Sequence, residues 1–170
     1  MATSLICFVH LCFVLALTSP SDTNPVNVRE AVIETAIGEI GVREVGSNRG
    51  EDVEKYLASA GFGGGYAWCA AFVNWVYIQH DIPTPKSAAW SPSWFPQSRV
   101  SDDIVRGDVF GVYFRSKGRI AHVGLIEENH GEFVYTIEGN TNEAGSREGD
   151  GVYRKRRVKR QIYRTANWID

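Results

Sequence analysis

The alternation that decides the fold runs from Asp108 to Glu138 and reads DVFGVYFRSKGRIAHVGLIEENHGEFVYTIE. Apolar residues recur there at every second position, in segments that short turns of glycine and polar residues separate, as is typical of strands joined by hairpins. Together with two further segments downstream, the predicted strands are 108–114, 120–127, 132–138, 152–158 and 161–166.

Upstream of this stretch, apolar residues fall three and four positions apart, which predicts helices. We expect a first helix over residues 26–42, a second that Ser47 caps and Gly61 ends, and a third over residues 68–80. Residues 81–100 hold four prolines and are predicted to form a loop with one short helical turn. Helices followed by strands in hairpin order indicate an α+β fold, with N-terminal helices packed on a C-terminal antiparallel sheet of about four to six strands.

Composition excludes several classes of protein. The chain has 170 residues, of which 44% are hydrophobic and 22% charged, so it is long enough for one globular domain and too apolar for a disordered chain. A formal net charge of -2 disfavours nucleic acid as a partner. Three cysteines are too few for a disulfide scaffold. The sequence has a single long apolar stretch, whereas a multi-pass membrane protein needs several.

The apolar stretch lies at the start of the chain. It spans Leu5–Leu17, and no acidic or basic residue precedes Asp22. We interpret residues 1–20 as a signal peptide, which leaves residues 21–170 as a single secreted or cell-envelope domain without stable membrane insertion. The alternatives are an uncleaved anchor and a buried core helix, although a core helix normally carries a polar face.

After cleavage Cys69 would be the sole cysteine of the domain. It falls in the first turn of the predicted third helix, after the glycine-rich run 61–65. Unpaired backbone N–H groups at that helix end stabilise a thiolate, which is the nucleophilic form of cysteine. The alternative is an inert thiol, because Cys69 also shares an apolar stripe with Phe72 and Val76. From the residues alone these two interpretations are evenly matched.

A cysteine nucleophile needs a base, and His122 is the candidate because it interrupts the apolar strand IAHVGLI. We expect it to point away from Val123, with open space beside it at Gly124. Glu138 or Asn140, at the end of the next strand, can accept the Nδ1–H of its imidazole. The alternatives are a buried histidine with satisfied hydrogen bonds and ordinary strand-end residues. No cluster has the spacing of metal ligands, so neither a metal nor a cofactor is expected.

Four sequence blocks resemble the CHAP family of cysteine- and histidine-dependent amidohydrolases and peptidases. They are YAWCAAFVNW at 66–75, RGDVF at 106–110, AHVGL at 121–125 and IEGN at 137–140. The resemblance implies a papain-like fold that cleaves amide bonds in peptidoglycan. By position it implies that Cys69 is the nucleophile, His122 the general base and acid and Glu138 the orienting carboxylate, with Asn140 a further member of the site.

Aromatic residues near this site are expected to contact the substrate. They are Tyr66, Trp68, Trp90 and Trp94. For the tryptophans of the proline-rich loop, packing on the core is the alternative. The basic run at 154–160 is interpreted as an edge strand whose charges prevent aggregation, with contact to an anionic polymer as the alternative.

The function that follows is an exported, monomeric peptidoglycan hydrolase, either an N-acetylmuramoyl-L-alanine amidase or an endopeptidase. The sequence does not choose between these two bonds. Two other classes stay open: a catalytically inactive wall-binding module of the same fold, and a cysteine peptidase or acyltransferase acting on protein.

Overall fold

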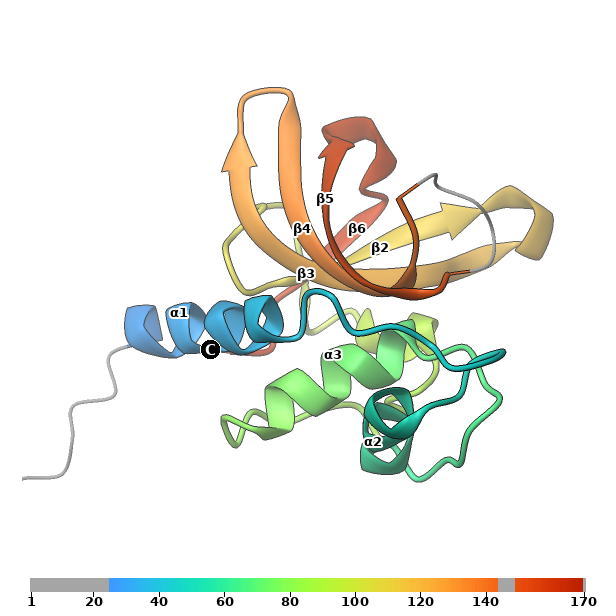
Figure 1. The fold of residues 1–170 in the computed structure, drawn as a ribbon. Helices are drawn as coiled ribbons and strands as arrows, with labels where there is room; N and C mark the ends of the chain where they lie inside the picture. The colour runs from blue at the N-terminus through green and yellow to red at the C-terminus, as the bar shows by residue number, and fades with distance from the viewer. Residues whose placement is uncertain (1–24, 144–148, 170) are drawn as a thin grey trace, which may run out of the picture.

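The computed structural model describes residues 25–143 and 149–169, so the predicted leader lies outside the described residues. Three helices, α1 (Pro25–Gly38), α2 (Glu51–Ser59) and α3 (Cys69–Ile78), lie on one side of a strongly curved antiparallel sheet (Figure 1). The strands of the described part are β1 (Val100–Ser101), β2 (Val109–Phe114), β3 (Arg119–His130), β4 (Phe133–Thr141), β5 (Gly151–Val158) and β6 (Arg164–Ala166). The predicted α+β architecture is confirmed.

The sheet has the strand order β1-β6-β2-β3-β4-β5. Successive strands from β2 to β5 pair as antiparallel hairpins, as the alternation predicts, and β6 returns between β1 and β2. In this order β5 is an edge strand, so the basic run does lie at an edge of the sheet. The register places Val112 opposite His122 and Leu125 opposite Ile137.

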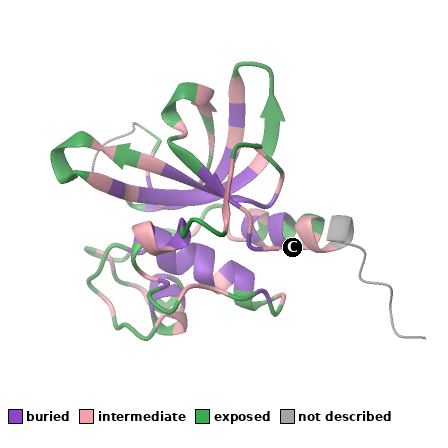
Figure 2. Cartoon of the chain, turned by 180° about the vertical axis from the view of Figure 1, so that it is seen from behind, coloured by how far each residue is buried: buried purple, intermediate pink, exposed green. Residues whose placement is uncertain are grey.

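The two faces of the sheet bury different clusters. Alternate residues of β3 and β4, including Val123, Leu125 and Ile137, pack with the helices in the main core (Figure 2). A small second core of Phe110, Ile126 and Val134 lies apart from it. The central strands are therefore buried on both faces, which fixes the positions of their side chains.

Gly139 sets how closely β4 approaches α3. A Cβ atom at this position would come within 2.7 Å of both the Phe72 and the Trp68 side chains, which real contacts do not allow. The absence of a side chain lets the end of β4 lie directly on the first turn of α3. As a result, the strand that carries Glu138 comes next to the helix end that carries Cys69.

Element ends differ from the sequence prediction in several places. The first helix ends at Gly38 rather than at residue 42, and the third covers Cys69–Ile78 rather than 68–80. Ser47 does not cap the second helix: Gly50, with φ +110°, is its N-cap. The predicted single turn in the proline-rich loop is confirmed as a 3₁₀ helix, η1 (Ser91–Trp94).

Two further 3₁₀ turns, η2 (Arg115–Lys117) and η3 (Lys159–Gln161), connect strands. The two-residue strand β1 was not expected, because its only strand partner, β6, is far away in sequence. Across the described residues, none of the helices combines the length and the apolar character that crossing a bilayer requires.

Candidate active site

Cys69 lies at the N-terminus of α3, one residue after the N-cap Trp68, and is 95% buried, with 5% exposure. The backbone N–H groups of a first helical turn have no partner within the helix and carry partial positive charge. Outside the helix, the backbone N–H of Val123 and the hydroxyl of Ser91, whose Oγ lies 3.7 Å from the sulfur, both lower the pKa of the Cys69 thiol. These contacts stabilise a negative charge on the sulfur.

His122 approaches Cys69 from β3, and both side chains line the same pocket, where the interaction of each with the other shifts its pKa. The other side of the ring is held by Glu138, whose Oε2 lies 2.7 Å from His122 Nε2. The expectation that the carboxylate would bind Nδ1 is therefore wrong. Because Nε2 is hydrogen-bonded to Glu138, Nδ1 is the ring nitrogen that can exchange a proton with the sulfur.

Glu138 is completely buried and is held by three side chains. Arg157 of β5 donates to both carboxylate oxygens at 2.5 Å, and Thr136 Oγ1 donates to Oε1 at 2.6 Å. The Arg157 guanidinium also stacks over Phe110 at 5.5 Å. A buried carboxylate requires such partners, because an unpaired charge away from water costs several kcal/mol (about 3–5 when one partner is removed).

The sequence reasoning missed Arg157 because it treated the basic run as a solvent-exposed set of charges. The signal that could have found it is Glu138 itself: a carboxylate predicted inside an apolar strand needs a cation, and the neighbouring strand offers one. The other members of the run have separate contacts. Arg154 pairs with Glu127 at 2.7 Å, and Arg156 stacks over Phe133.

The pKa shifts describe an ion pair between sulfur and imidazole. Burial raises the pKa of the Cys69 thiol, but the hydrogen bond and charge of His122 outweigh it and lower the pKa below its ordinary value. Burial lowers the pKa of His122, but hydrogen bonds with Cys69 and Glu138 outweigh it and raise the pKa to about 9. The pKa of Glu138, which burial raises, is held well below its usual range by Arg157 and His122.

When the proton of the Cys69 thiol resides on His122, the four groups alternate in charge: thiolate, imidazolium, the Glu138 carboxylate and the Arg157 guanidinium. Each charge faces an opposite one, so the buried set is neutral as a whole. Such an arrangement favours the charged form of the thiol and lowers its pKa.

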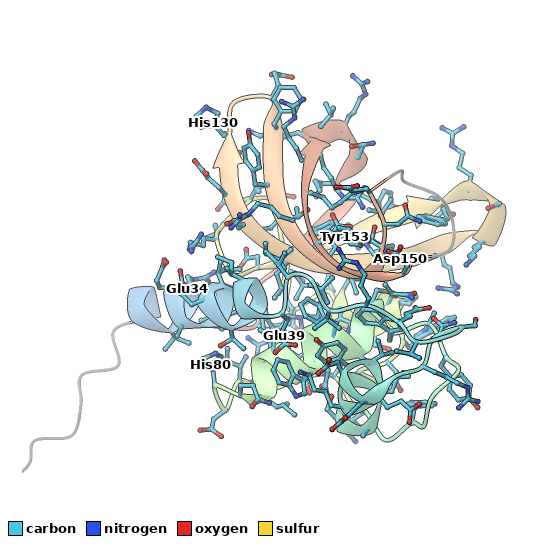
Figure 3. All side chains as sticks on the ribbon, viewed as in Figure 1. Glu34, Glu39, His80, His130, Asp150 and Tyr153 are labelled. Carbon is cyan, nitrogen blue, oxygen red and sulfur yellow. The ribbon has the colours of Figure 1, made fainter. Side chains whose placement is uncertain are left out.

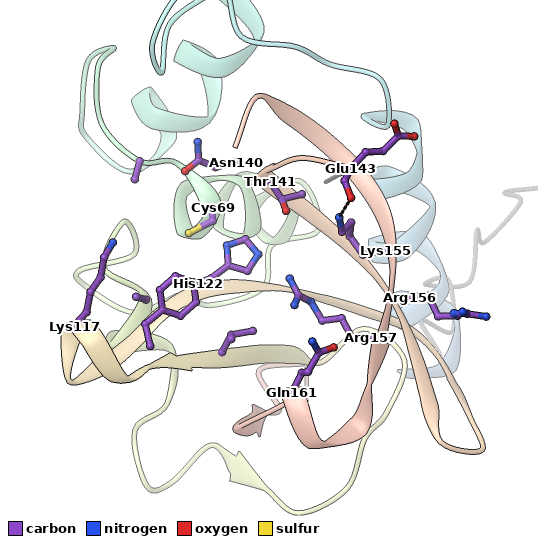
Figure 4. A pocket seen from close by; sticks show the side chains of 14 residues that line it. Cys69, Lys117, His122, Asn140, Thr141, Glu143, Lys155, Arg156, Arg157 and Gln161 are labelled. Carbon is purple, nitrogen blue, oxygen red and sulfur yellow. Dashed lines mark hydrogen bonds between the residues drawn. The ribbon is translucent and has the colours of Figure 1, made fainter. Parts of the chain in front are cut away.

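Asn140 lies at the same end of β4 but does not contact His122. Its Nδ2 donates to Glu44 Oε1 and to Asn48 Oδ1, both at 3.0 Å, and its φ of +52° turns it out of the strand. Glu44 Oε1 also accepts the indole N–H of Trp68 at 2.7 Å. Asn140 therefore ties the loop before α2 to the helix end that carries Cys69, and it lines the cleft above the sulfur (Figure 4).

Gly124 does not leave open space beside the histidine. A Cβ there would lie 2.8 Å from Phe110, 2.9 Å from Glu138 Cγ and 2.9 Å from the carbonyl oxygen of Ile137. The space that glycine frees is filled by the carboxylate side chain, so Gly124 is required for Glu138 to reach His122.

The four predicted substrate-binding aromatics separate into two groups. Tyr66 and Trp90 are 58% and 49% exposed. Trp68 and Trp94 are completely buried, so the expectation that they contact substrate is wrong. Trp68 stacks on Tyr56, and Trp94 packs edge-on against Tyr77 and donates its indole N–H to a backbone carbonyl.

Two pockets meet at Cys69. The histidine-side pocket, of about 380 Å³, is lined by His122, Asn140, Thr141, Lys155, Arg157 and Gln161 among others (Figure 4). The aromatic pocket, of about 410 Å³, is lined by Phe62, Tyr66, Lys86, Trp90 and Arg119 among others. Ala67, Cys69, Lys117 and Ala121 line both, so the two pockets form one cleft with the sulfur at its centre.

The other histidines of the described residues line neither pocket; Figure 3 shows His80 below α1 and His130 at the far end of the β3–β4 hairpin. His80 Nε2 is 2.8 Å from Thr35 Oγ1 of α1, and His130 is exposed at the turn between β3 and β4. Within residues 25–143 and 149–169, no three His, Cys, Asp or Glu side chains gather in a way that could hold a metal ion.

Comparisons with known proteins give structural neighbours of low sequence identity. The peptidoglycan hydrolase RipB from Mycobacterium tuberculosis has a TM-score of 0.53 and 20% identity, over 92% of this chain and 75% of that chain. The NlpC/p60 domain of the peptidoglycan hydrolase SagA has a TM-score of 0.47 and 17% identity, over 82% and 97%. The likeness to RipB confirms the predicted papain-like α+β fold.

A protein described as similar to lipoprotein of the NLP/P60 family, from Staphylococcus aureus, has a TM-score of 0.48 and 16% identity. The alignment covers 90% of this chain but only 45% of that protein, so this chain spans less than half of its length. No curated protein sequence matches the chain.

The model of the CHAP domain family matches residues 61–140. This segment begins at the glycine-rich run before Cys69, includes His122 and Glu138, and ends at Asn140. The resemblance of the four sequence blocks is therefore confirmed: residues 61–140, which contain all four blocks, match the CHAP domain family.

Proposed function

We propose that the chain is a peptidoglycan hydrolase that cleaves an amide bond of the wall with Cys69 as its nucleophile. The CHAP match and the fold shared with a known peptidoglycan hydrolase support the substrate class. The predicted signal peptide and the wall substrate together support a secreted or cell-envelope location. The bond is that of an amidase or of an endopeptidase.

The geometry supports acyl transfer in two steps. The Cys69 thiolate attacks the amide carbonyl carbon, and first-turn N–H groups of α3 stabilise the resulting oxyanion. The C–N bond then breaks as His122 gives its proton to the leaving amine, which leaves a thioester on Cys69. Water attacks the thioester while His122 takes one of its protons; the C–S bond breaks, the carboxylic acid leaves, and the thiolate and the imidazolium are regenerated.

The observation that carries the proposal is the buried row of ionisable side chains Arg157, Glu138 and His122, which ends beside the Cys69 sulfur in an open cleft. Burying ionised groups carries a free-energy penalty that a hydrophobic core would avoid. A wall-binding module has no need of a thiolate, whereas a cysteine hydrolase depends on one. The arrangement therefore favours an enzyme over an inactive module.

The test is digestion of purified peptidoglycan with the full chain and with Cys69→Ala, followed by measurement of new free amines. The wild type is expected to release amines and the variant to release none above background. His122→Ala is expected to be inactive as well, with the exposed His130→Ala as its matched control at full activity. Release of amines by Cys69→Ala at the wild-type rate would overturn the proposal.

Casein digested in parallel separates wall hydrolysis from general proteolysis. We expect no new amines from casein. Cleavage of casein but not of peptidoglycan would favour a peptidase that acts on protein and would contradict the wall substrate.

A further inference from the structure

The two pockets of the cleft differ in which of the two proposed catalytic residues, Cys69 and His122, lines them. Cys69 lines both pockets, because the sulfur lies where they meet. His122 lines only the histidine-side pocket. The site is therefore asymmetric about the sulfur, and this asymmetry gives the substrate a direction.

The direction follows from the proton transfer. In the mechanism proposed above, the carbonyl carbon bonds to the sulfur, and the leaving nitrogen must lie beside the group that protonates it. That group is His122, so the amine fragment of the substrate extends into the histidine-side pocket. The acyl fragment, which stays on Cys69 as a thioester, then extends into the aromatic pocket.

The histidine-side pocket suits an amine fragment that carries carboxylates. Lys155 lines only this pocket, Lys117 lines both this pocket and the aromatic pocket, and Glu143 is the acidic residue of the histidine-side pocket. Lys155 donates to the backbone carbonyl of Glu143 at 3.2 Å, whereas Lys117 has no carboxylate partner among the described residues. The charge of Arg157 is already matched by Glu138, so positive charge remains in excess at this end.

Arg156 also borders this pocket, but its guanidinium stacks over Phe133 and points away from the cleft in Figure 4. Asn140, Thr141 and Gln161 complete the wall with groups that donate and accept hydrogen bonds. A peptide with acidic side chains matches such a wall in charge and in polarity.

The aromatic pocket suits a ring that presents an apolar face of C–H groups. The exposed rings of Tyr66 and Trp90 line it, and Phe62 packs against Tyr66 at 5.4 Å. Arg119 lies 4.0 Å from the centre of the Trp90 ring and fixes its orientation. Large aromatic rings that stay exposed beside a reactive sulfur indicate a surface that a ligand covers.

We propose that the aromatic pocket binds the sugar ring of a glycan-linked acyl group and that the histidine-side pocket binds an acidic peptide as the leaving amine. In peptidoglycan this pairing occurs at the amide between the lactyl group of the sugar and the first stem residue. The inference rests on the proposed function and selects, between its two bonds, the one that releases the whole stem peptide.

The test is mass spectrometry of the products from intact peptidoglycan. The inference expects stem peptides with a free amino terminus and glycans whose lactyl groups carry no peptide. Cleavage within the peptide, with the first residue still on the sugar, would overturn this inference and leave the proposed function standing. Failure to cut any wall bond would overturn both.

Variants test the charge of the cleft and its exposed ring in turn. On disaccharide–peptide fragments, a free carboxylate on the second stem residue is expected to raise kcat/KM about fivefold over its amide, the size of a partly exposed ion pair. Lys117→Gln and Lys155→Gln are expected to reduce this preference, whereas Lys159→Gln, which lines neither pocket, keeps it. If Lys117→Gln and Lys155→Gln both keep the full preference for the free carboxylate, the histidine-side pocket does not bind an acidic peptide.

Trp90→Ala is expected to raise KM for the disaccharide–peptide about tenfold, the loss expected for a stacked aromatic contact. Trp90→Phe keeps a ring and is expected to recover most of the affinity. If Trp90→Ala leaves KM unchanged, the sugar does not bind on this ring and the assignment of the aromatic pocket is wrong.

Discussion

The salt bridge between Arg157 and Glu138 offers a quantitative test of the buried charge set. Arg157→Met removes the guanidinium and keeps an unbranched apolar stem in the same space. The change deletes two charge-assisted hydrogen bonds of 2.5 Å to a carboxylate with no exposed surface. Glu138 then keeps only His122 and Thr136 as partners.

The expected loss is about 3 kcal/mol of unfolding free energy at pH 7, the lower end for breaking a buried ion pair by removing one partner. For a domain of this size this corresponds to a fall in Tm of about 6–12 °C. Arg154→Met is the matched control, because it removes a two-point contact with Glu127 from the same strand. The Arg154 side chain is 49% exposed, against 17% for Arg157, so this control is expected to lose less than about 1 kcal/mol.

The difference in unfolding free energy between wild type and Arg157→Met is expected to depend on pH, which gives a second check. Because the folded-state pKa of Glu138 lies below its ordinary value of 4.5, the carboxylate stabilises the fold above that pH, and the contribution is lost as pH falls toward the folded-state pKa. Without Arg157 the folded-state pKa rises. The gap between wild type and Arg157→Met is therefore expected to narrow as pH falls below about 4.5.

The assay is urea unfolding followed by tryptophan fluorescence at pH 7 and at steps down to pH 3. Equal destabilisation by Arg157→Met and Arg154→Met would refute the reasoning. A gap that stays constant over the acidic range would also refute it, because the ion pair would then not depend on the ionisation of Glu138.

Three further results are expected. Gly124→Ala places a methyl group against Phe110 and Glu138 and is expected to lower kcat at least about tenfold while the fold, followed by circular dichroism, persists; normal activity would contradict the close approach. The rate of wall hydrolysis is expected to follow a bell-shaped pH profile whose alkaline limb lies near pH 9, where His122 loses its proton, and a limb below pH 7 would oppose this. Glu138→Gln removes the charge that raises the pKa of His122, so its residual activity is expected to have the alkaline limb at lower pH, and an unmoved limb would count against the role of the carboxylate.

Much of the architecture could be predicted from local pattern alone. The alternation over residues 108–138 identifies β2, β3 and β4 because one face of each strand packs on the helices. The position of Cys69 in a first helical turn follows from the glycine run before it. What escaped prediction depends on contacts distant in sequence, as with β1, whose hydrogen bonds go to β6.

In the candidate active site, too, some residues could be predicted from local pattern and others depend on contacts distant in sequence. His122 and Glu138 stand out because each is a polar residue inside an apolar strand, and the structure brings both together beside Cys69. Asn140 does not join them, because a left-handed backbone turn aims it at Glu44. Arg157 could not be distinguished from its basic neighbours by composition, since only the register of β5 against β4 decides which arginine faces inward.

The most direct test of the central claim is the rate at which iodoacetamide alkylates Cys69 as a function of pH, followed by mass spectrometry of the peptide that carries it. If the thiol is ionised by His122, the wild type reacts at full rate well below pH 9, the ordinary pKa of a thiol, and His122→Asn moves the rise in rate to higher pH. A single rise centred near pH 9, the same in both proteins, would show that the imidazole does not ionise the sulfur and would contradict the account.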